Sequence, residues 1–105
     1  MVSWGCTVID NDAHSIKSSE RRDDVRNWKK GIDEGQPWKY KDWSKIIASA
    51  VTIQDQAWIG FNCIILKGVE IGHSSIIGAG SVVTKSIADH TLAAGNPAKE
   101  IKPTI

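Results

Sequence analysis

The stretch "AWIGFNCIILKGVEIGHSSIIGAGSVVTK", residues 57–85, carries an aliphatic residue at every sixth position. This aliphatic column begins upstream of the stretch and consists of Ile47, Ile53, Ile59, Ile65, Ile71, Ile77 and Val83. A second column, four places further along each hexad, is mostly small and consists of Val51, Ala57, Cys63, Val69, Ser75, Ser81 and Ile87. A period of six fits neither an α-helix nor a simple strand, so we interpret the region as a structural repeat.

The hexad period predicts short strands separated by tight corners, with three strands in each triangular coil. Residues three hexads apart, such as Ile47, Ile65 and Val83, then stack about 4.8 Å above one another in the interior. The small column fits the narrow space beside each corner. Three glycines follow the aliphatic column, and we expect them where a Cβ would block a backbone angle or a close approach. They are Gly60, Gly72 and Gly78.

The composition indicates one small cytoplasmic domain. The chain has 105 residues and a formal net charge of +1, so no strong overall field attracts nucleic acid or an anionic membrane. No apolar stretch approaches the roughly 18 residues that span a membrane, and the N-terminus lacks a signal-peptide pattern. Cys6 and Cys63 have no metal-ligand spacing, so we expect two reduced, small core residues and no metal.

The chain divides into segments of different composition within a single β-helix domain over residues 1–105. We expect a first partial coil in residues 1–14 and a charged, aromatic insertion with a short helix in residues 15–46. Hexapeptide coils are expected in residues 47–88, and a C-terminal tail in residues 89–105.

The first segment repeats the six-residue spacing through Val2 and Val8, with small Cys6 between them, but in a different phase. The insertion therefore resets the count. Roughly three coils are close to the minimum for a stable solenoid, so we expect the protein to depend on oligomerisation.

The insertion contains a helix signal, "SSERRDDVRNWKKG" at residues 18–31, with Ser18 or Ser19 as N-cap and Gly31 as the stop. Its predicted apolar stripe consists of Val25, Trp28 and Ile32. The following "QPWKYKDWSK", residues 36–45, interleaves aromatic residues with lysines. Three readings stay open for it: stacking on sugar faces, contact with a nucleic acid backbone, or packing on a neighbouring subunit.

The hexad columns, together with "AAGNPAKEIK" at residues 93–102, resemble the hexapeptide-repeat acyltransferases, and within them the sugar and galactoside O-acetyltransferases. The match is close over residues 47–102 and looser over residues 2–14. The resemblance implies an all-β fold, a left-handed parallel β-helix that usually assembles as a trimer. It also implies transfer of an acetyl group from acetyl-CoA to a hydroxyl or amine. We therefore expect a homotrimer that acts on a sugar or a similar hydroxylated acceptor.

The resemblance implies a coenzyme groove between neighbouring subunits, held largely by backbone groups. On that pattern, the amide of Ala79, beside Gly80, binds the pantetheine arm, and Trp58 lies at the active-site groove. An alternative for Trp58 is that it only covers the outside of the coil.

Four further residues match the family's phosphate-binding positions. Thr84 and Lys85 are expected near the nucleotide's phosphates, and Lys99 and Lys102 match positions that often carry basic residues. Lysine suits this role as a point charge. The alternative for each lysine is a solvated surface charge.

The repeats supply no catalytic base, so the base is expected among the three histidines. His73 falls at a corner and His90 in a turn, where exposed or structural roles are expected. His14 follows "TVIDND" and opens the insertion, where the sugar acetyltransferases place their catalytic histidine. A histidine can withdraw the proton of a sugar hydroxyl at neutral pH while the oxygen attacks the thioester.

An acidic partner for His14 is expected nearby. If residues 10–14 are extended, Asp10, Asp12 and His14 share one face, and an acidic neighbour holds the imidazole tautomer. Asp12 is assigned to binding of the acceptor. The alternative function, from another class, is a non-catalytic trimeric scaffold or binding module that keeps the fold without turnover.

Overall fold

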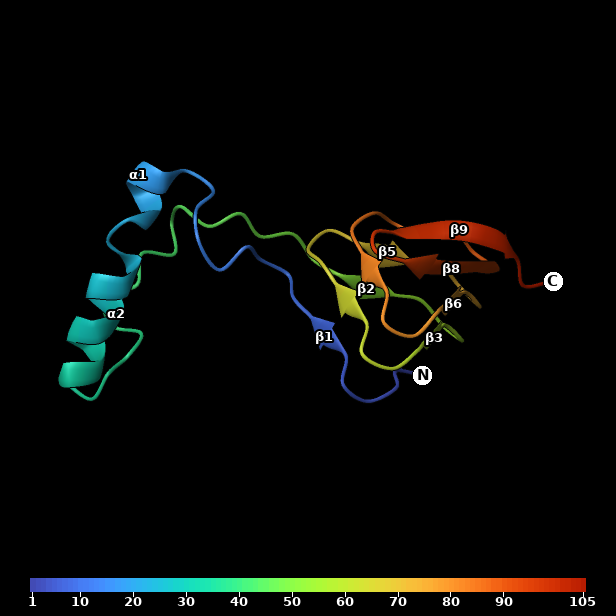
Figure 1. Cartoon of the computed structure of the whole chain (residues 1–105), viewed down its shortest axis with the longest axis horizontal. Helices are drawn as coiled ribbons and strands as arrows, with labels where there is room; N and C mark the ends of the chain where they lie inside the picture. Colours follow the sequence, from blue (N-terminus) through green and yellow to red (C-terminus); the bar gives the residue numbers. More distant parts are fainter. The chain divides into compact units, whose positions relative to one another are not determined.

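The computed structural model describes residues 1–105, which form two compact units (Figure 1). Unit 1 consists of residues 1–11 and 48–105, and unit 2 consists of residues 12–47. Unit 2 contains the two helices, α1 (Ser18–Arg21) and α2 (Asp24–Asp33). Neither helix is long and apolar enough to cross a membrane.

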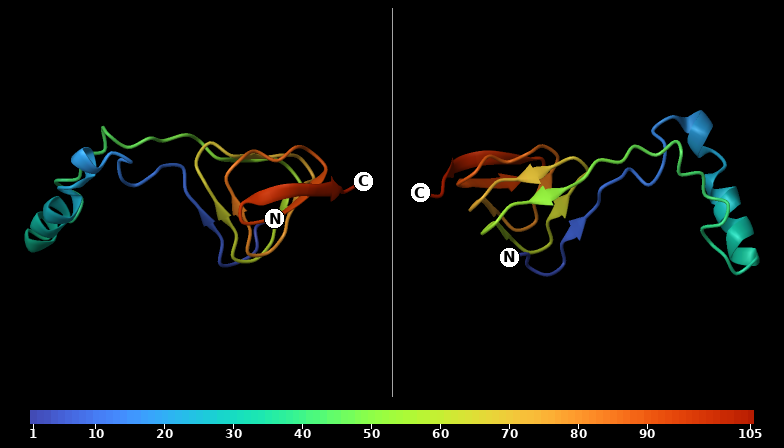
Figure 2. Two further views of the ribbon diagram at one scale, coloured as in Figure 1. Left: turned by 45° about the horizontal axis from the view of Figure 1, so that its top comes forward. Right: turned by 180° about the vertical axis from the view of Figure 1, so that it is seen from behind.

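Unit 1 is a left-handed parallel β-helix whose coils lie one above another (Figure 2). Its strands are β1 (Thr7–Val8), β2 (Thr52–Ile53), β3 (Trp58–Ile59), β4 (Ile64–Ile65), β5 (Glu70–Ile71), β6 (Ile76–Ile77), β7 (Val82–Val83), β8 (Thr91–Gly95) and β9 (Ala98–Pro103). They form three sheets with the strand orders β1-β4-β7, β2-β5 and β3-β6-β8-β9. Only the β8–β9 pair is antiparallel.

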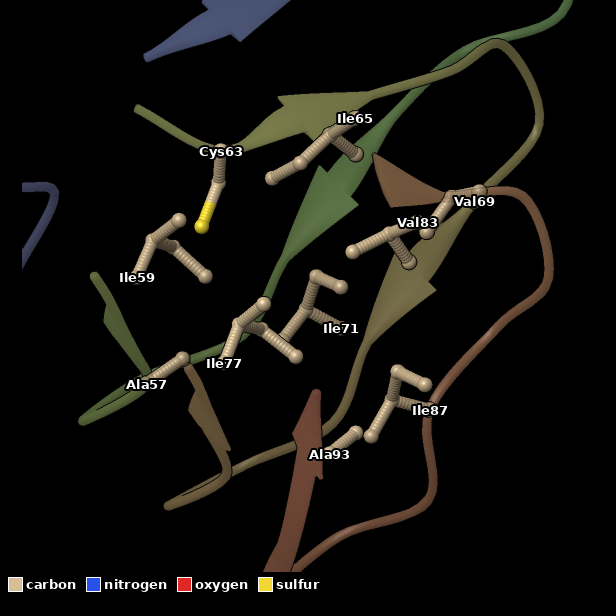
Figure 3. Close-up of a cluster of buried hydrophobic side chains, with 10 residues drawn as sticks. All are labelled: Ala57, Ile59, Cys63, Ile65, Val69, Ile71, Ile77, Val83, Ile87 and Ala93. Carbon is tan, nitrogen blue, oxygen red and sulfur yellow. The ribbon is translucent and has the colours of Figure 1, made fainter. Parts of the chain in front are cut away.

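The aliphatic column fills the interior of the coils, as the hexad period predicts. Strands three hexads apart pair in parallel, with the registers Ile53↔Ile71, Ile59↔Ile77 and Ile65↔Val83. The side chains of Ile59, Ile65, Ile71, Ile77 and Val83 are at most 1% exposed, and Figure 3 shows them pointing toward one another. Burying these side chains is the main source of stability in this unit.

The corners also recur every six residues. A left-handed backbone angle, with φ between 56° and 74°, occurs at Gln56, Asn62, Gly68, Ser74 and Gly80. The glycines after the aliphatic column serve a different purpose, because a Cβ on Gly60 would lie 2.7 Å from the amide nitrogen of Ala79 in the coil above. These glycines therefore permit close approach between coils, and the corner itself lies two places further on.

The small column is buried beside the corners, and its serines are hydrogen-bonded there. Ser75 Oγ donates to the carbonyl of Ala88 over 2.6 Å, and Ser81 Oγ donates to the carbonyl of Gly78 over 2.5 Å. Cys6 and Cys63 are both free thiols, and burial raises the pKa of Cys63.

The expectation that Ile47 stacks with Ile65 and Val83 is wrong for Ile47. Val8, and not Ile47, pairs with Ile65, while Ile47 is 52% exposed. The cause is the insertion, whose two ends leave the coil side by side: the Ser49 amide donates to the carbonyl of Asp10 over 2.8 Å. The first coil therefore runs through residues 2–8 and resumes after the insertion.

The last coil is two residues shorter than the hexad period predicts. Ile87 pairs with Ile71, and Ala93 pairs with Ile77, so that both partners are separated by 16 residues. Ile87 was expected in the small column, but it lies in the interior and is 6% exposed. Because the last coil is two residues shorter, Ile87 takes the position of the aliphatic column.

The helix prediction for the insertion is only partly right. Two helices form, α1 begins after Lys17 rather than after a serine cap, and α2 continues to Asp33. Gly31 does not end the helix, because it is buried against the backbone of residues 36–37, where a Cβ would lie 2.5 Å from a carbonyl oxygen. The left-handed residue that follows the helix is Gly35, with φ of 72°.

Candidate active site

His14 lies in a turn at the start of unit 2. Ala13 has a left-handed φ of 62°, and the amide of His14 donates to the carbonyl of Asp12 over 2.6 Å. The expectation that residues 10–14 are extended, and that their alternate side chains share a face, is therefore wrong. The chain turns at Ala13 and directs the imidazole toward the helical part of the insertion.

The acidic partner of His14 is Asp24, the first residue of α2. The Nδ1 atom of His14 lies 2.6 Å from Oδ2 of Asp24, whose side chain is 13% exposed. An ionised carboxylate only accepts hydrogen bonds, so Nδ1 carries the hydrogen and Nε2 of the neutral ring has a free lone pair. Asp24 was not predicted from the sequence, because the helix was expected to begin at Ser18 or Ser19, and the start of α2 at Asp24 could not be seen.

Lys41 completes this cluster from the loop after α2. Its Nζ lies 3.0 Å from the same Asp24 oxygen and 3.1 Å from Nδ1 of His14, and its side chain is 5% exposed. The hydrogen bond from His14, followed by that from Lys41, holds the pKa of Asp24 below its ordinary value. Asp24 is therefore a carboxylate at neutral pH.

The cluster borders an open hollow of about 440 Å³ with mostly apolar walls. The remaining lining residues are Ala13, Val25, Trp28 and Trp43. The Trp28 ring packs edge-on against Trp38 at 5.2 Å, and Lys41 Nζ lies 5.5 Å from the centre of the Trp43 ring. Part of the stripe predicted on the helix thus forms a wall of the hollow instead of a buried contact.

His14 also borders a second, smaller hollow of about 270 Å³, which is more polar. Asp12 lines this hollow, together with Ser15, Ile16, Lys17, Glu20, Lys45 and Ile47. Asp12 and His14 therefore border one space, although Asp12 is not the residue that contacts Nδ1.

In unit 1, the outer face of the four-stranded sheet carries several of the residues predicted to bind coenzyme. Trp58 pairs with Ile76, Ile76 pairs with Leu92, and Leu92 pairs with Lys102. Paired side chains of a sheet point the same way, so these four side chains form one row across the sheet. Trp58 stands at one edge, 45% exposed, and Lys102 stands at the other.

A bulge in the β8–β9 pair puts Lys99 on the same face. The register shifts between Leu92 and Ala93, so that Lys99 pairs with Ala94 while Lys102 pairs with Leu92. Since Leu92 and Ala94 point to the same side of β8, the two lysines do so as well. The structure thus brings together Trp58, Lys99 and Lys102.

Ala79 and Gly80 lie in the exposed corner that follows β6. The Gly80 amide donates to the carbonyl of Phe61 over 2.8 Å, whereas the Ala79 amide makes no hydrogen bond within the chain. Thr84 and Lys85 are exposed in the next corner, after β7, away from the four-stranded sheet. Within one chain, therefore, Lys85 does not join Lys99 and Lys102.

The other two histidines contact one another in unit 1. Their rings pack edge to face with centroids 5.5 Å apart, and the amide of His90 donates to the carbonyl of His73 over 2.8 Å. His90 has a left-handed φ of 50°. Neither ring contacts a carboxylate as His14 does.

Part of the repeat matches a known family model. Residues 50–85 match the family model described as "Bacterial transferase hexapeptide (six repeats)". The resemblance to the hexapeptide-repeat transferases, which was read from the sequence columns, is confirmed.

Solved structures with the same fold include sugar acetyltransferases. A maltose O-acetyltransferase from Clostridium difficile 630 superposes with a TM-score of 0.72 and 34% identity, over 98% of this chain and 44% of that one. A galactoside acetyltransferase in complex with coenzyme A has a TM-score of 0.72 and 28% identity, over 96% and 40% of the two chains.

Curated relatives match a shorter stretch more closely. A Schizosaccharomyces pombe protein named "Putative acetyltransferase" is 58% identical over 52 residues, which is 50% of this chain and 25% of that protein. The chain thus spans about a quarter of the length of this relative, and less than half of each of the two solved structures.

Proposed function

We propose that this protein is an acetyl-CoA-dependent acetyltransferase with a sugar-like hydroxyl acceptor, and that His14 is its general base. The observation that carries the proposal is the 2.6 Å hydrogen bond between His14 Nδ1 and Asp24. It fixes the tautomer in which Nε2 is free to accept a proton. The sugar acetyltransferases among the structural relatives support the same reaction.

In the proposed reaction, His14 Nε2 accepts the proton of the acceptor hydroxyl while the oxygen attacks the thioester carbonyl. A carbon–oxygen bond forms, the carbon–sulfur bond breaks, and the imidazolium returns its proton to the leaving thiolate. Asp24 stabilises the charged ring between these two steps. No covalent bond to the protein is required.

The hollow beside His14 supports a sugar-like acceptor. Trp28 and Trp43 give it flat apolar walls, on which the C–H face of a pyranose ring can stack. The polar edge formed by His14, Asp24 and Lys41 is suited to the hydroxyl side of the same ring. A sugar has both an apolar face and hydroxyl groups, so it can contact both the apolar walls and the polar edge of the hollow.

The outer face of the four-stranded sheet fits the coenzyme. Ile76 and Leu92 give an apolar floor for a pantetheine arm, and the unused amide of Ala79 is a donor for one of its carbonyls. In this proposal Lys99 and Lys102, which lie on the same face of the sheet, bind phosphate oxygens as point charges. When bound, the coenzyme supplies the activated acetyl thioester.

A homotrimer is part of this proposal. The family resemblance implies that the coenzyme lies between subunits, so Thr84 and Lys85 of one copy and the lysines of β9 of another contact the same ligand. Such an arrangement explains why one chain carries these basic residues in two separate places. A cytoplasmic location, where acetyl-CoA is available, belongs to the same proposal.

Thiol release tests the function directly. We expect CoA to raise the melting temperature of the protein, and free thiol to appear from acetyl-CoA only when an accepted sugar is added. The panel contains mono- and disaccharides, with a reaction lacking acceptor as the control. Binding of CoA without thiol release from any acceptor contradicts the proposal and favours a non-catalytic scaffold.

A further inference from the structure

Lys41 is a largely buried cation that takes no part in the proton transfers of the proposed reaction. Its side chain is only 5% exposed, although lysine is usually solvated. Its Nζ lies 3.0 Å from Asp24 Oδ2 and 3.1 Å from His14 Nδ1. Burying an ammonium group costs free energy unless the charge is paired, and the ion pair with Asp24 offsets that cost. The ion pair alone does not explain why Nζ also lies beside the imidazole.

The three groups meet with a defined donor pattern. Nδ1 of His14 and Nζ of Lys41 both donate to Oδ2 of Asp24. An ammonium group has no lone pair, and Nδ1 carries its own hydrogen, so the contact of 3.1 Å between the two nitrogens is not a hydrogen bond. It becomes repulsive once the imidazole gains a second proton.

We propose that Lys41 is a positioning residue that balances the charge of Asp24, so that His14 keeps its tautomer and stays neutral as a base. This inference rests on the proposed role of His14. A carboxylate alone beside a histidine favours the imidazolium, which cannot accept a hydroxyl proton. Lys41 opposes that effect and leaves the hydrogen bond from Nδ1 in place.

The other charged groups that face His14 do not replace Lys41. They line the second hollow and consist of Asp12, Lys17, Glu20 and Lys45. These are two acids and two bases, so their formal charges cancel, and Asp42 adds a further negative charge near Asp24. The charge of Asp24 is therefore left unbalanced beside the imidazole when Lys41 loses its charge.

Nitrogen NMR of the His14 ring tests the inference without requiring turnover. In the full chain, we expect Lys41→Met to move the midpoint of ring protonation upward by about one pH unit or more, because a unit charge 3.1 Å away is worth about one unit even in water and the side chains of Lys41 and Asp24 are largely buried. Lys41→Gln, which keeps a donor for Asp24 without the charge, should move it equally. Lys41→Arg should keep the wild-type midpoint.

Lys39→Met is the matched control, because Lys39 is an exposed residue of the same loop that lies over Tyr40. It should leave the midpoint unchanged. The acidic limb of kcat/KM should shift with Lys41→Met by the same amount as the NMR midpoint.

An unchanged midpoint in both Lys41→Met and Lys41→Gln overturns the inference, since a purely structural lysine alters the melting temperature and not the ring titration. A shifted midpoint supports it. Absence of thiol release by the wild-type protein counts against the proposed function alone, so the two claims fail separately.

Discussion

The hydrogen bond between His14 and Asp24 links a turn to the first residue of α2. This bond and the one from Lys41 lower the pKa of Asp24 below its ordinary value of 3.8. The folded protein therefore stabilises the ionised carboxylate relative to the unfolded chain. The resulting stabilisation is fully present above the unfolded value. It is lost as the pH falls through the lower folded value.

Replacement of Asp24 by asparagine should therefore destabilise unit 2 in a pH-dependent way. We expect Asp24→Asn to melt at a lower temperature than wild type at about pH 7, and the difference to shrink below about pH 4. Thermal unfolding followed by tryptophan fluorescence measures both. Asp33→Asn is the control, because Asp33 is an exposed residue of α2 whose pairing with Lys29 contributes little. A difference that stays constant down to pH 3 would show that the charge of Asp24 is not the cause.

The proposal that His14 is the base rests on its place at the start of the insertion, whereas the residue that contacts its imidazole could not be predicted from the sequence. Residues 10–14 do not alternate as a strand would, because Ala13 takes a left-handed angle that no residue pattern indicated. Asp24 and Lys41 are distant in sequence from His14, and only the packing of the insertion brings them to it. The lysines of β9 share a face only because of a bulge, which the hexad pattern does not reveal.

At the scale of the elements, a charged side chain can be introduced on the outer face of the stacked strands but not on the inner face. Ile59 on β3 is fully buried between Val2 and Ile77, so Ile59→Lys would bury an unpaired charge. We expect a loss of at least about 3 kcal/mol of unfolding free energy, or no folding. Urea unfolding followed by circular dichroism measures this loss.

Thr52→Lys is the control for this substitution, because Thr52 on β2 is exposed and pairs with Glu70. The same charge is then solvated and lies beside a carboxylate, so stability should change little. An Ile59→Lys protein as stable as the Thr52→Lys protein would mean that the six-residue register is wrong.

The register of the coils could be predicted because each hexad repeats the same local requirement for one interior aliphatic and one small residue. The two departures are places where the repeat is interrupted. Val8 replaces Ile47 in the stack because the insertion leaves within the first coil, and Ile87 enters the interior because the last coil is shorter. The predicted end of α2 at Gly31 is wrong, because this glycine packs closely against the backbone of residues 36–37 and does not cap the helix.

For the whole molecule, a single chain leaves large apolar groups uncovered. In unit 1, Trp4 is 79% exposed and contacts Phe61, which is 42% exposed, with ring centroids 4.8 Å apart. Trp58 is 45% exposed on another face. We therefore expect these groups to be covered by association, and the family resemblance predicts a homotrimer at micromolar concentration. Sedimentation velocity over a dilution series measures the mass, and a stable, folded monomer at all concentrations would contradict this expectation.

The central claim, that His14 is the base of an acetyltransferase, is tested most directly by thiol release from His14→Ala. The variant should keep the assembly and CoA affinity of the wild type, because the coenzyme is expected to contact unit 1. With an accepted sugar, its rate should fall by about 10² to 10⁴. His73→Ala and His90→Ala, which alter histidines that contact one another instead of a carboxylate, should turn over at nearly the wild-type rate. A His14→Ala protein that releases thiol as fast as wild type would contradict the account.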